Sequence, residues 1–132
     1  MKYYCKKEEV QNSLKTEAIL IDTRTTDEYS GEKLKKGAQK AGRIPSAFHI
    51  DWAEAIHFSG DKRFKSMQEL ENIYGNIIPS TEAPCILYCH TGMRSAHTTF
   101  VLTQLLGYSN VKNYDGSWTE WSHFNNLPLQ KN

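Results

Sequence analysis

The chain has 132 residues, of which 39% are hydrophobic and 23% charged, and this composition is typical of one globular domain rather than a disordered chain. Its formal net charge of +1 argues against nucleic acid or an anionic membrane as the main partner. No apolar run approaches the roughly 20 residues of a membrane span, and residues 1–9 lack the apolar core of a signal peptide.

The three cysteines are Cys5, Cys85 and Cys89, an odd number without C-x-x-C spacing. A disulfide framework is therefore not expected, and a reducing cytoplasm is the predicted location. No pair of the five histidines has cysteine or carboxylate neighbours at a familiar zinc spacing. We therefore predict neither a metal site nor a cofactor.

The first elements are read from short patterns. Residues 6–14 predict a helix with few core positions, and the apolar residues 18–21 predict a strand. That strand ends at the polar residues 22–24, which gives the first candidate position for functional side chains. Such polar residues at the carboxyl end of a strand are frequent in the ligand sites of open α/β sheets.

Capping chemistry then predicts a helix start. Thr25 and Glu28 have the spacing of a capping box, and Gly31 follows as a stop. The connection that follows, residues 32–40, is rich in lysine. We expect a solvated loop there, with a binding surface as the alternative.

The middle of the chain predicts a further strand and a helix. Residues 47–52 are expected to form a strand, and Ser66 with Glu69 predicts a second capping box. The residues expected on the apolar stripe of this helix recur at helical spacing. They are Met67, Leu70, Ile73, Tyr74 and Ile77.

The most apolar strand candidate, residues 85–88, ends at Cys89, and a helix is predicted to open at Arg94. Gly107 is the predicted end of that helix. Its expected core face consists of Phe100, Val101, Leu102, Leu105 and Leu106.

The last predicted strand, residues 111–114, ends at the turn 115–118, and residues 128–132 are expected to be a frayed end. Short strands that alternate with helices predict an α/β fold with a mainly parallel sheet and helices on both faces. Ligands bind beyond the carboxyl ends of such strands. Asp22, Arg24, Cys89 and the turn should therefore share one edge of the molecule.

A single cysteine after an apolar strand is often an inert core residue, and Cys85 fits that description. Cys89 differs because a polar loop containing Gly92 follows it. Glycine permits a positive φ, so successive N–H groups can turn toward the sulfur, and the next helix directs its positive end there. Arg94 adds a fixed positive charge, and together these features favour the thiolate, which is the nucleophilic form.

Four segments, taken in order, resemble the signatures of the rhodanese family of sulfurtransferases. The first is Leu20-Ile21-Asp22-Thr23-Arg24 followed by Asp27-Glu28-Tyr29-Ser30-Gly31, and the second is Ala41-Gly42-Arg43-Ile44-Pro45-Ser46-Ala47. The third is the six-residue active loop Cys89-His90-Thr91-Gly92-Met93-Arg94, and the last is Tyr114-Asp115-Gly116-Ser117-Trp118 with Glu120-Trp121. The resemblance implies a rhodanese fold over nearly the whole chain.

The closing signature is similar to that of the catalytic, C-terminal half of tandem thiosulfate and 3-mercaptopyruvate sulfurtransferases. Residues 1–132 are thus expected to form one domain, either a stand-alone protein or half of a tandem one. In tandem proteins an inactive domain closes over the site, so a single domain should have a more open one. Arg43 and Ser46 depart from the usual His and Gly of the second signature, which affects loop geometry rather than the nucleophile.

The resemblance implies ping-pong catalysis through a persulfide on Cys89. A small anionic sulfur donor, thiosulfate, would load the sulfur, and a thiol, protein cysteine or cyanide would remove it. The loop residues expected to hold donor and sulfur are His90, Thr91, Gly92, Met93 and Ser95. Arg94 and Arg24 are the predicted donor-binding cations, with a structural ion pair as the alternative for Arg24. Asp22 and Ser117 are predicted to support the site. For Ser117, a hydroxyl that reaches the sulfur and a simple turn or N-cap role are equally open.

Donor preference and reaction class have alternatives. Thr91-Gly92 resembles the loop of mercaptopyruvate enzymes, whereas His90 and Arg94 keep cationic character. A persulfide carrier for a protein acceptor is a further possibility. A phosphatase or arsenate reductase is disfavoured because those loops are one residue longer and residue 95 is Ser rather than Arg. A non-catalytic binding module is disfavoured because the cysteine is present.

Overall fold

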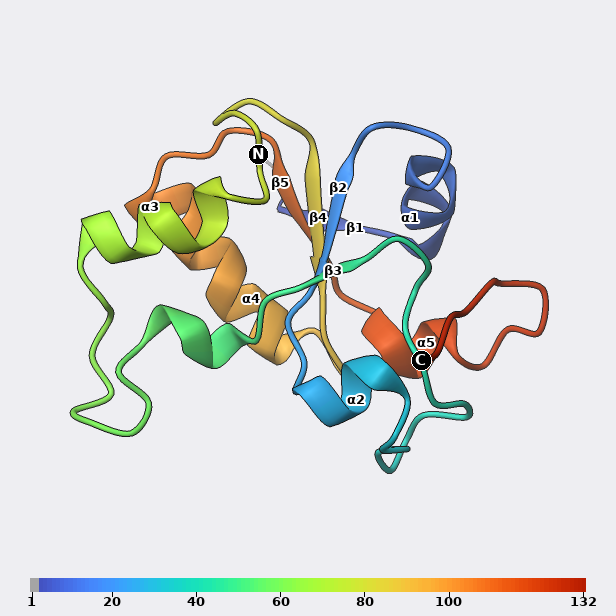
Figure 1. Ribbon diagram of the computed structural model, residues 1–132. Helices are drawn as coiled ribbons and strands as arrows, with labels where there is room; N and C mark the ends of the chain where they lie inside the picture. The colour runs from blue at the N-terminus through green and yellow to red at the C-terminus, as the bar shows by residue number, and fades with distance from the viewer. Residues whose placement is uncertain (1–2) are drawn as a thin grey trace.

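The structure, a computed structural model, describes residues 3–132. It contains β1 (Tyr4–Cys5), β2 (Ile19–Asp22), β3 (Phe48–His49), β4 (Cys85–Tyr88) and β5 (Val111–Tyr114). These strands form one sheet in the order β1-β5-β4-β2-β3, in which every neighbouring pair is parallel (Figure 1). The predicted α/β class with a parallel sheet is therefore confirmed.

The helical elements are α1 (Lys7–Ser13), α2 (Thr26–Ser30), the 3₁₀ turn η1 (Trp52–Ala55), α3 (Met67–Gly75), α4 (Met93–Phe100), the π-helical turn η2 (Val101–Leu105) and α5 (Ser117–Trp121). Both predicted capping boxes are present, because the hydroxyls of Thr25 and Ser66 accept the N–H groups of Glu28 and Glu69. Gly31 ends α2 with a φ of 93°, a left-handed conformation that glycine adopts without a Cβ penalty.

Two apolar cores cover the two faces of the sheet, with α3 and α4 on one side and α1 and α5 on the other (Figure 1). On the first face Tyr74 and Leu102 belong to the same buried cluster as Ile21. On the second face Trp118 and Trp121 are 1% exposed and cluster with the side chains that β2 and β4 direct to this face. A sheet buried on both faces explains why β4 is apolar at every position.

The prediction of core burial is wrong for two side chains. Met67 is 50% exposed because it is the first residue of α3 and lies beyond the buried stripe. Phe100 is 47% exposed at the junction of α4 and η2, where its ring stacks on Phe64 at 6.2 Å. The buried residues of α4 are Ser95, Thr98 and Thr99, and Phe100 lies outside this stripe, whereas Val101 and Leu102 are buried as predicted.

The strand predicted over residues 47–52 is shorter than expected. Ser46 has a φ of 70° immediately before it, and the Asp51 carboxylate accepts the Ala53 N–H to begin η1. The sequence also gave no signal for β1, a two-residue strand that pairs Tyr4 with Asn113. Strands this short depend on their partner rather than on local pattern.

The frayed end predicted for residues 128–132 is also wrong. Gln130 forms an antiparallel bridge with Arg43, with N–H to O distances of 2.8 and 2.9 Å. The Asn132 N–H donates to the Ser30 carbonyl at 3.0 Å, and its side-chain oxygen accepts from Arg43 at 2.9 Å. The tail thus closes the second face of the sheet beside α2.

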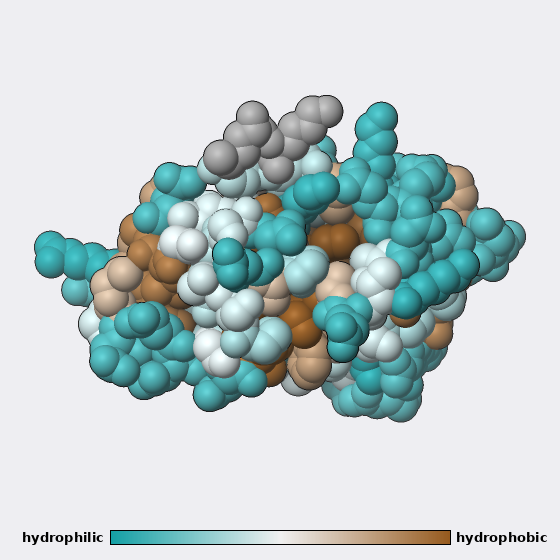
Figure 2. All heavy atoms as spheres, turned by 90° about the horizontal axis from the view of Figure 1, so that it is seen from above, coloured by the Kyte–Doolittle hydropathy of each residue, from teal (hydrophilic) through white to brown (hydrophobic). Residues whose placement is uncertain are grey.

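The central strands β2, β4 and β5 run downward in Figure 1, so their carboxyl ends lie toward the lower end of the molecule. Figure 2 shows the upper end, where hydrophilic side chains form most of the surface and apolar ones show between them in a central band. Among residues 3–132 no helix is long and apolar enough to cross a membrane.

Candidate active site

The site begins where β4 ends. Residues 89–92 form a loop between β4 and α4, and Gly92 is the N-cap of α4 with a φ of 94°. Because β5, β4 and β2 are neighbours, their carboxyl ends bring the turn after β5 and Asp22 beside Cys89. Main-chain bonds tie these segments: Trp118 N–H donates to the Cys89 carbonyl at 2.9 Å. The predicted grouping at one edge is confirmed.

The sulfur of Cys89 is surrounded by donors and has no exposed surface. The Gly92 N–H points to Sγ at 3.1 Å, and Ser95 Oγ lies 3.5 Å away. Burial opposes the thiolate, but hydrogen bonds from the Ser95 hydroxyl and from the N–H groups of Ser95, Thr91 and Gly92 outweigh it, so the pKa of Cys89 lies below its usual value.

The other two thiols have the opposite environment. Burial raises the pKa of Cys85 to about 12, and burial together with the charge of Glu9 raises that of Cys5 to about 12. Neither thiol is surrounded by loop N–H groups. All three cysteines are free. Cys89 is thus the one thiol whose surroundings favour the nucleophilic form.

Glycine is required at position 92 for two reasons. Its positive φ is one that L side chains rarely adopt, and a Cβ there would lie 2.6 Å from the Asp115 carbonyl oxygen. The turn after β5 therefore packs directly on the loop backbone. This close approach turns the Gly92 N–H toward the sulfur.

Ser117 supports the backbone rather than the sulfur. Its Oγ accepts the Cys89 N–H at 3.1 Å and donates to the Tyr114 carbonyl at 2.8 Å. The residue is fully buried with a φ of 54°, a left-handed conformation that non-glycine residues seldom adopt. The structure thus shows a fixed turn that positions Cys89, one of the two roles expected from the sequence.

Arg94 pairs with Glu28 of α2. Two hydrogen bonds of 2.9 and 3.0 Å join the guanidinium to the carboxylate. Burial raises the pKa of Glu28, but the opposing effects of Arg94 and the Thr25 cap are larger and bring this pKa down to about 2. The Arg94 side chain is 20% exposed; burial opposes its charge, but the hydrogen bonds and charge of Glu28, with a smaller contribution from the charge of Cys89, raise the pKa of Arg94, so it remains a cation.

Arg24 lies deeper. Its guanidinium is 2% exposed, bonds Asp22 at 2.7 Å and donates to the Gly42 carbonyl at 2.6 Å. It also lies over the ring of Trp118, 5.0 Å from the centroid. The structural ion pair expected as the alternative role is therefore what the structure shows, and Asp22 organises the end of β2.

His90, predicted to hold donor and sulfur, is buried, with 6% of its surface exposed. Its Nε2 lies 2.9 Å from the Lys36 carbonyl, which makes Nε2 the protonated nitrogen. Burial lowers the pKa of His90, and the ring is neutral at pH 7, so it does not contribute the cationic character expected from the sequence. Of the remaining loop residues, Thr91 and Met93 are exposed, and Met93 reaches 79%.

Two functional neighbours escaped the sequence prediction. Glu28 was noted only as a capping residue, and its reach to Arg94 spans 66 residues. Asn113 was noted only as part of a strand, yet its Nδ2 donates to the Gly92 carbonyl at 3.1 Å and its Oδ1 accepts from Ser95 Oγ at 2.6 Å. A buried amide inside a strand is the signal that could have identified it.

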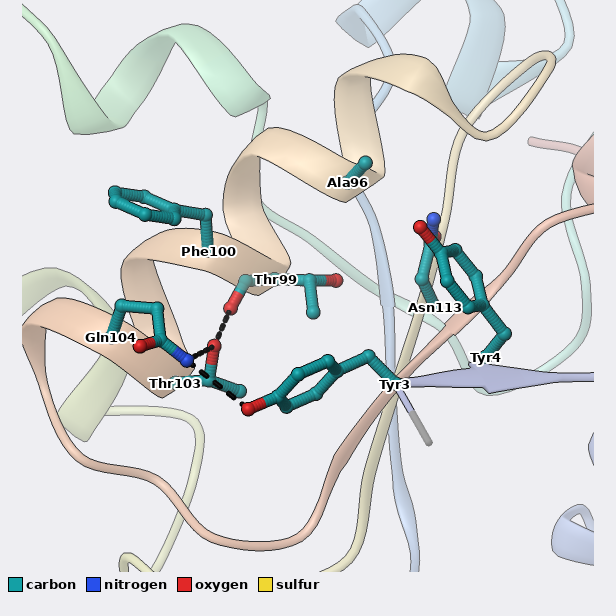
Figure 3. A pocket seen from close by; sticks show the side chains of 8 residues that line it. All are labelled: Tyr3, Tyr4, Ala96, Thr99, Phe100, Thr103, Gln104 and Asn113. Carbon is teal, nitrogen blue, oxygen red and sulfur yellow. Dashed lines mark hydrogen bonds between the residues drawn. The ribbon is translucent and has the colours of Figure 1, made fainter. Parts of the chain in front are cut away.

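Asn113 also borders a cavity of about 150 Å³ (Figure 3). The cavity is lined by residues of β1, α4 and η2, among them Tyr4 and Phe100. Its polar contacts include a hydrogen bond from Gln104 to the Tyr3 hydroxyl at 3.1 Å. Figure 3 shows Asn113 beside Tyr4, so one strand residue contacts both the active loop and this cavity.

An α/β domain with a cysteine of lowered pKa in the loop after a central parallel strand is the class that fold and site define. The chain belongs to the rhodanese-like domain family, whose model matches residues 6–124.

Curated relatives agree with this family. SseA of Mycobacterium tuberculosis, named provisionally as a thiosulfate sulfurtransferase, is 47% identical over 83% of this chain and 38% of its own length. The sulfur carrier protein TtuD of Thermus thermophilus is 42% identical over 85% of the chain and 41% of its own length. A thiosulfate sulfurtransferase of Corynebacterium glutamicum is 38% identical over 84% and 38%. The chain spans about two fifths of the length of these relatives.

Solved structures show the same fold. EanB in complex with ergothioneine superposes with a TM-score of 0.86 at 25% identity, covering 98% of this chain and 32% of that one. An EanB structure with a cysteine persulfide and ergothioneine gives a TM-score of 0.84 at 26% identity over 98% and 32%.

Proposed function

We propose that this domain is a sulfurtransferase that carries sulfane sulfur from thiosulfate to a thiophilic acceptor as a persulfide on Cys89. The observation that carries the proposal is the sulfur's environment: N–H groups and a hydroxyl converge on Sγ, and Arg94 lies beside it. The names of the relatives support it, since they include thiosulfate sulfurtransferases and a sulfur carrier.

In the first half-reaction the Cys89 thiolate attacks the outer sulfur of thiosulfate. A sulfur–sulfur bond forms to Cys89, the bond within thiosulfate breaks, and sulfite leaves with the electron pair. In the second half-reaction cyanide or a thiolate attacks the outer persulfide sulfur, and the Cys89 thiolate is the leaving group. No cofactor is needed for either step.

The loop supplies the electrostatic stabilisation. The sulfur carries negative charge before and after each transfer, and the Gly92 N–H already points to it. Loss of one such donor costs about 3 kcal/mol in enzymes that stabilise an oxyanion in this way. The loop geometry should therefore matter as much as any single side chain.

The two arginines and the exposed loop residues have different proposed roles. Arg94 is partly exposed and would attract the anionic end of the donor, with Glu28 holding its orientation. Thr91 and Met93, on the exposed side of the loop, would form the approach. Arg24 would act through Asp22, because its own guanidinium is buried.

Two alternatives keep a specific observation in their favour. The name of TtuD supports a persulfide carrier that serves a protein acceptor. The Thr91-Gly92 pair favours 3-mercaptopyruvate as donor because it resembles the loop of mercaptopyruvate enzymes.

Three free cysteines support a reducing cytoplasm as the location.

The test is a steady-state assay of thiocyanate formation from cyanide, with thiosulfate or 3-mercaptopyruvate as donor. We expect parallel double-reciprocal lines, the signature of a ping-pong mechanism, and no activity in Cys89→Ser. Cys85→Ser is the matched control and should retain activity. Absence of thiocyanate with both donors, or full activity in Cys89→Ser, would refute the proposal.

A further inference from the structure

The basic charge of the chain is concentrated in residues 32–40, which we call the lysine loop. The loop holds four lysines and one glutamate, whereas the whole chain has a net charge of +1, so the rest of the chain is net negative. Lys33, Lys35 and Lys36 are exposed. No carboxylate among residues 3–132 forms an ion pair with any lysine of the loop.

The backbone of the lysine loop is fixed to the active site although its side chains are free. The His90 ring donates to the Lys36 carbonyl at 2.9 Å, and the Trp118 indole donates to the Lys40 carbonyl at 2.8 Å. The Gln39 N–H donates to Ser122 Oγ at 2.9 Å. A mobile charged loop would lose entropy on binding a partner, whereas this one is already ordered.

The lysine loop also presents an apolar side chain. Leu34 is 56% exposed between Lys33 and Lys35. A surface that alternates ammonium groups with an exposed leucine is complementary to an acidic segment that carries an apolar side chain. A small inorganic donor has no use for the leucine.

The lysine loop lies close to Cys89. His90 directly follows Cys89, its ring bonds the Lys36 carbonyl, and a Cβ on Gly37 would lie 3.5 Å from its Nε2. The charge of Lys35 contributes, after burial, to the lowered pKa of His90. Because Cys89 has no exposed surface, a protein acceptor must bring its cysteine on an exposed, narrow segment.

We propose that the lysine loop is the docking surface for an acidic segment of a sulfur-accepting protein, which it holds while the acceptor cysteine enters beside His90. This rests on the proposed sulfur transfer from Cys89. Electrostatic steering of this kind raises association rates and depends on ionic strength.

Two synthetic acceptor peptides test the proposal, each with one cysteine and one leucine, flanked by glutamates in one and by lysines in the other. The protein is first loaded with thiosulfate, and transfer of sulfur to each peptide is followed by mass spectrometry. We expect the acidic peptide to react roughly tenfold faster than the basic one at low salt, with the ratio falling toward unity as salt screens the charges.

Lys35→Ala and Lys36→Ala should reduce this ratio, whereas the charge-matched Lys15→Ala should leave it unchanged, because Lys15 is exposed in the segment that enters the amino end of β2, opposite the strand ends that form the site. Leu34→Ser should lower the rate with the acidic peptide without removing the salt dependence. Circular dichroism checks that each variant is folded.

The outcomes separate the two claims. If thiosulfate loads no sulfur, the proposed function fails. If Cys89 is loaded but the peptides react equally, or if Lys15→Ala lowers the ratio as much as Lys35→Ala, the docking surface is refuted. A uridine oligonucleotide that competes more strongly than the acidic peptide would assign the loop to RNA and overturn the proposal as well.

Discussion

At the scale of single residues, the three cysteine thiols lie in environments that shift their pKa values in opposite directions. Cys89 has a lowered pKa because loop donors outweigh burial, whereas the pKa values of Cys5 and Cys85 are raised to about 12. A thiol reacts as its thiolate, so we expect alkylation by iodoacetamide to modify Cys89 at a lower pH than a free cysteine peptide. Peptide mapping of the native protein should find Cys5 and Cys85 unmodified. A midpoint for Cys89 at or above that of the peptide would contradict the described environment.

Ser95 has one hydroxyl proton and three acceptors. Asn113 Oδ1 lies 2.6 Å from its Oγ, the Gly92 carbonyl 3.2 Å and Cys89 Sγ 3.5 Å. The Asn113 amide donates to Gly92, which fixes its oxygen as the acceptor for Ser95. Asn113 therefore competes with the sulfur for this proton and acts as a positioning residue.

A double-mutant cycle tests this competition. Asn113→Leu should lower the pKa of Cys89 further, because the Ser95 hydroxyl would donate to the sulfur without competition from the Asn113 amide oxygen. In a Ser95→Ala background the same change should not shift the pKa. The charged and titratable groups around Cys89 stay constant in the cycle; they are Asp22, Arg24, Glu28, His90, Arg94 and Asp115. An equal shift in both backgrounds would show that Asn113 acts through the loop backbone alone.

Gly92→Ala should disrupt the loop. The left-handed conformation costs a non-glycine residue about 1–2 kcal/mol, and the new Cβ would also lie 2.6 Å from the Asp115 carbonyl. We expect sulfur transfer to fall at least about tenfold and the alkylation midpoint of Cys89 to rise, because the Gly92 N–H no longer reaches the sulfur. Gly75→Ala is the control, since nothing lies within 4 Å of a Cβ there. Unchanged transfer in Gly92→Ala would contradict this geometry.

At the scale of elements, the pair between Glu28 and Arg94 joins α2 to the start of α4. The folded-state pKa of Glu28, about 2, lies below its usual value of 4.5. Its contribution is therefore complete above about pH 4.5 and is lost as the pH falls toward about 2. The corresponding upper limit is roughly 3 kcal/mol, and the partial exposure of Arg94 reduces it.

Glu28→Gln tests this pair. It should lower the free energy of unfolding by about 1–3 kcal/mol at pH 7, because Arg94 loses its partner, and the difference from the parent should disappear near pH 2. Chemical denaturation at several pH values measures both effects. A difference that persists unchanged at pH 2 would mean that the carboxylate charge is not its source.

At the scale of the whole molecule, local patterns predicted the elements that have a strong local cause. The apolar strands β2 and β4 are buried on both faces, and the capping boxes at Thr25 and Ser66 are satisfied within their own turns. The convergence of Asp22 and Cys89 followed from parallel strand order alone.

The rest depended on contacts between distant segments. The tail is held by its bridge to Arg43 and by the bond from the Asn132 N–H to the Ser30 carbonyl, and the His90 ring bonds the Lys36 carbonyl of the lysine loop. Glu28 and Asn113 gain their roles from partners that the fold brings near. These distances along the chain explain why sequence patterns pointed to Cys89, the proposed nucleophile, but not to the residues that position its loop.

The most direct test of the central claim is the intact mass of the protein after incubation with thiosulfate and again after addition of cyanide. Sulfur transfer through Cys89 predicts a gain of one sulfur atom, its removal by cyanide, and no gain in Cys89→Ser. No sulfur adduct with either thiosulfate or 3-mercaptopyruvate, or an adduct that persists in Cys89→Ser, would contradict the proposed function.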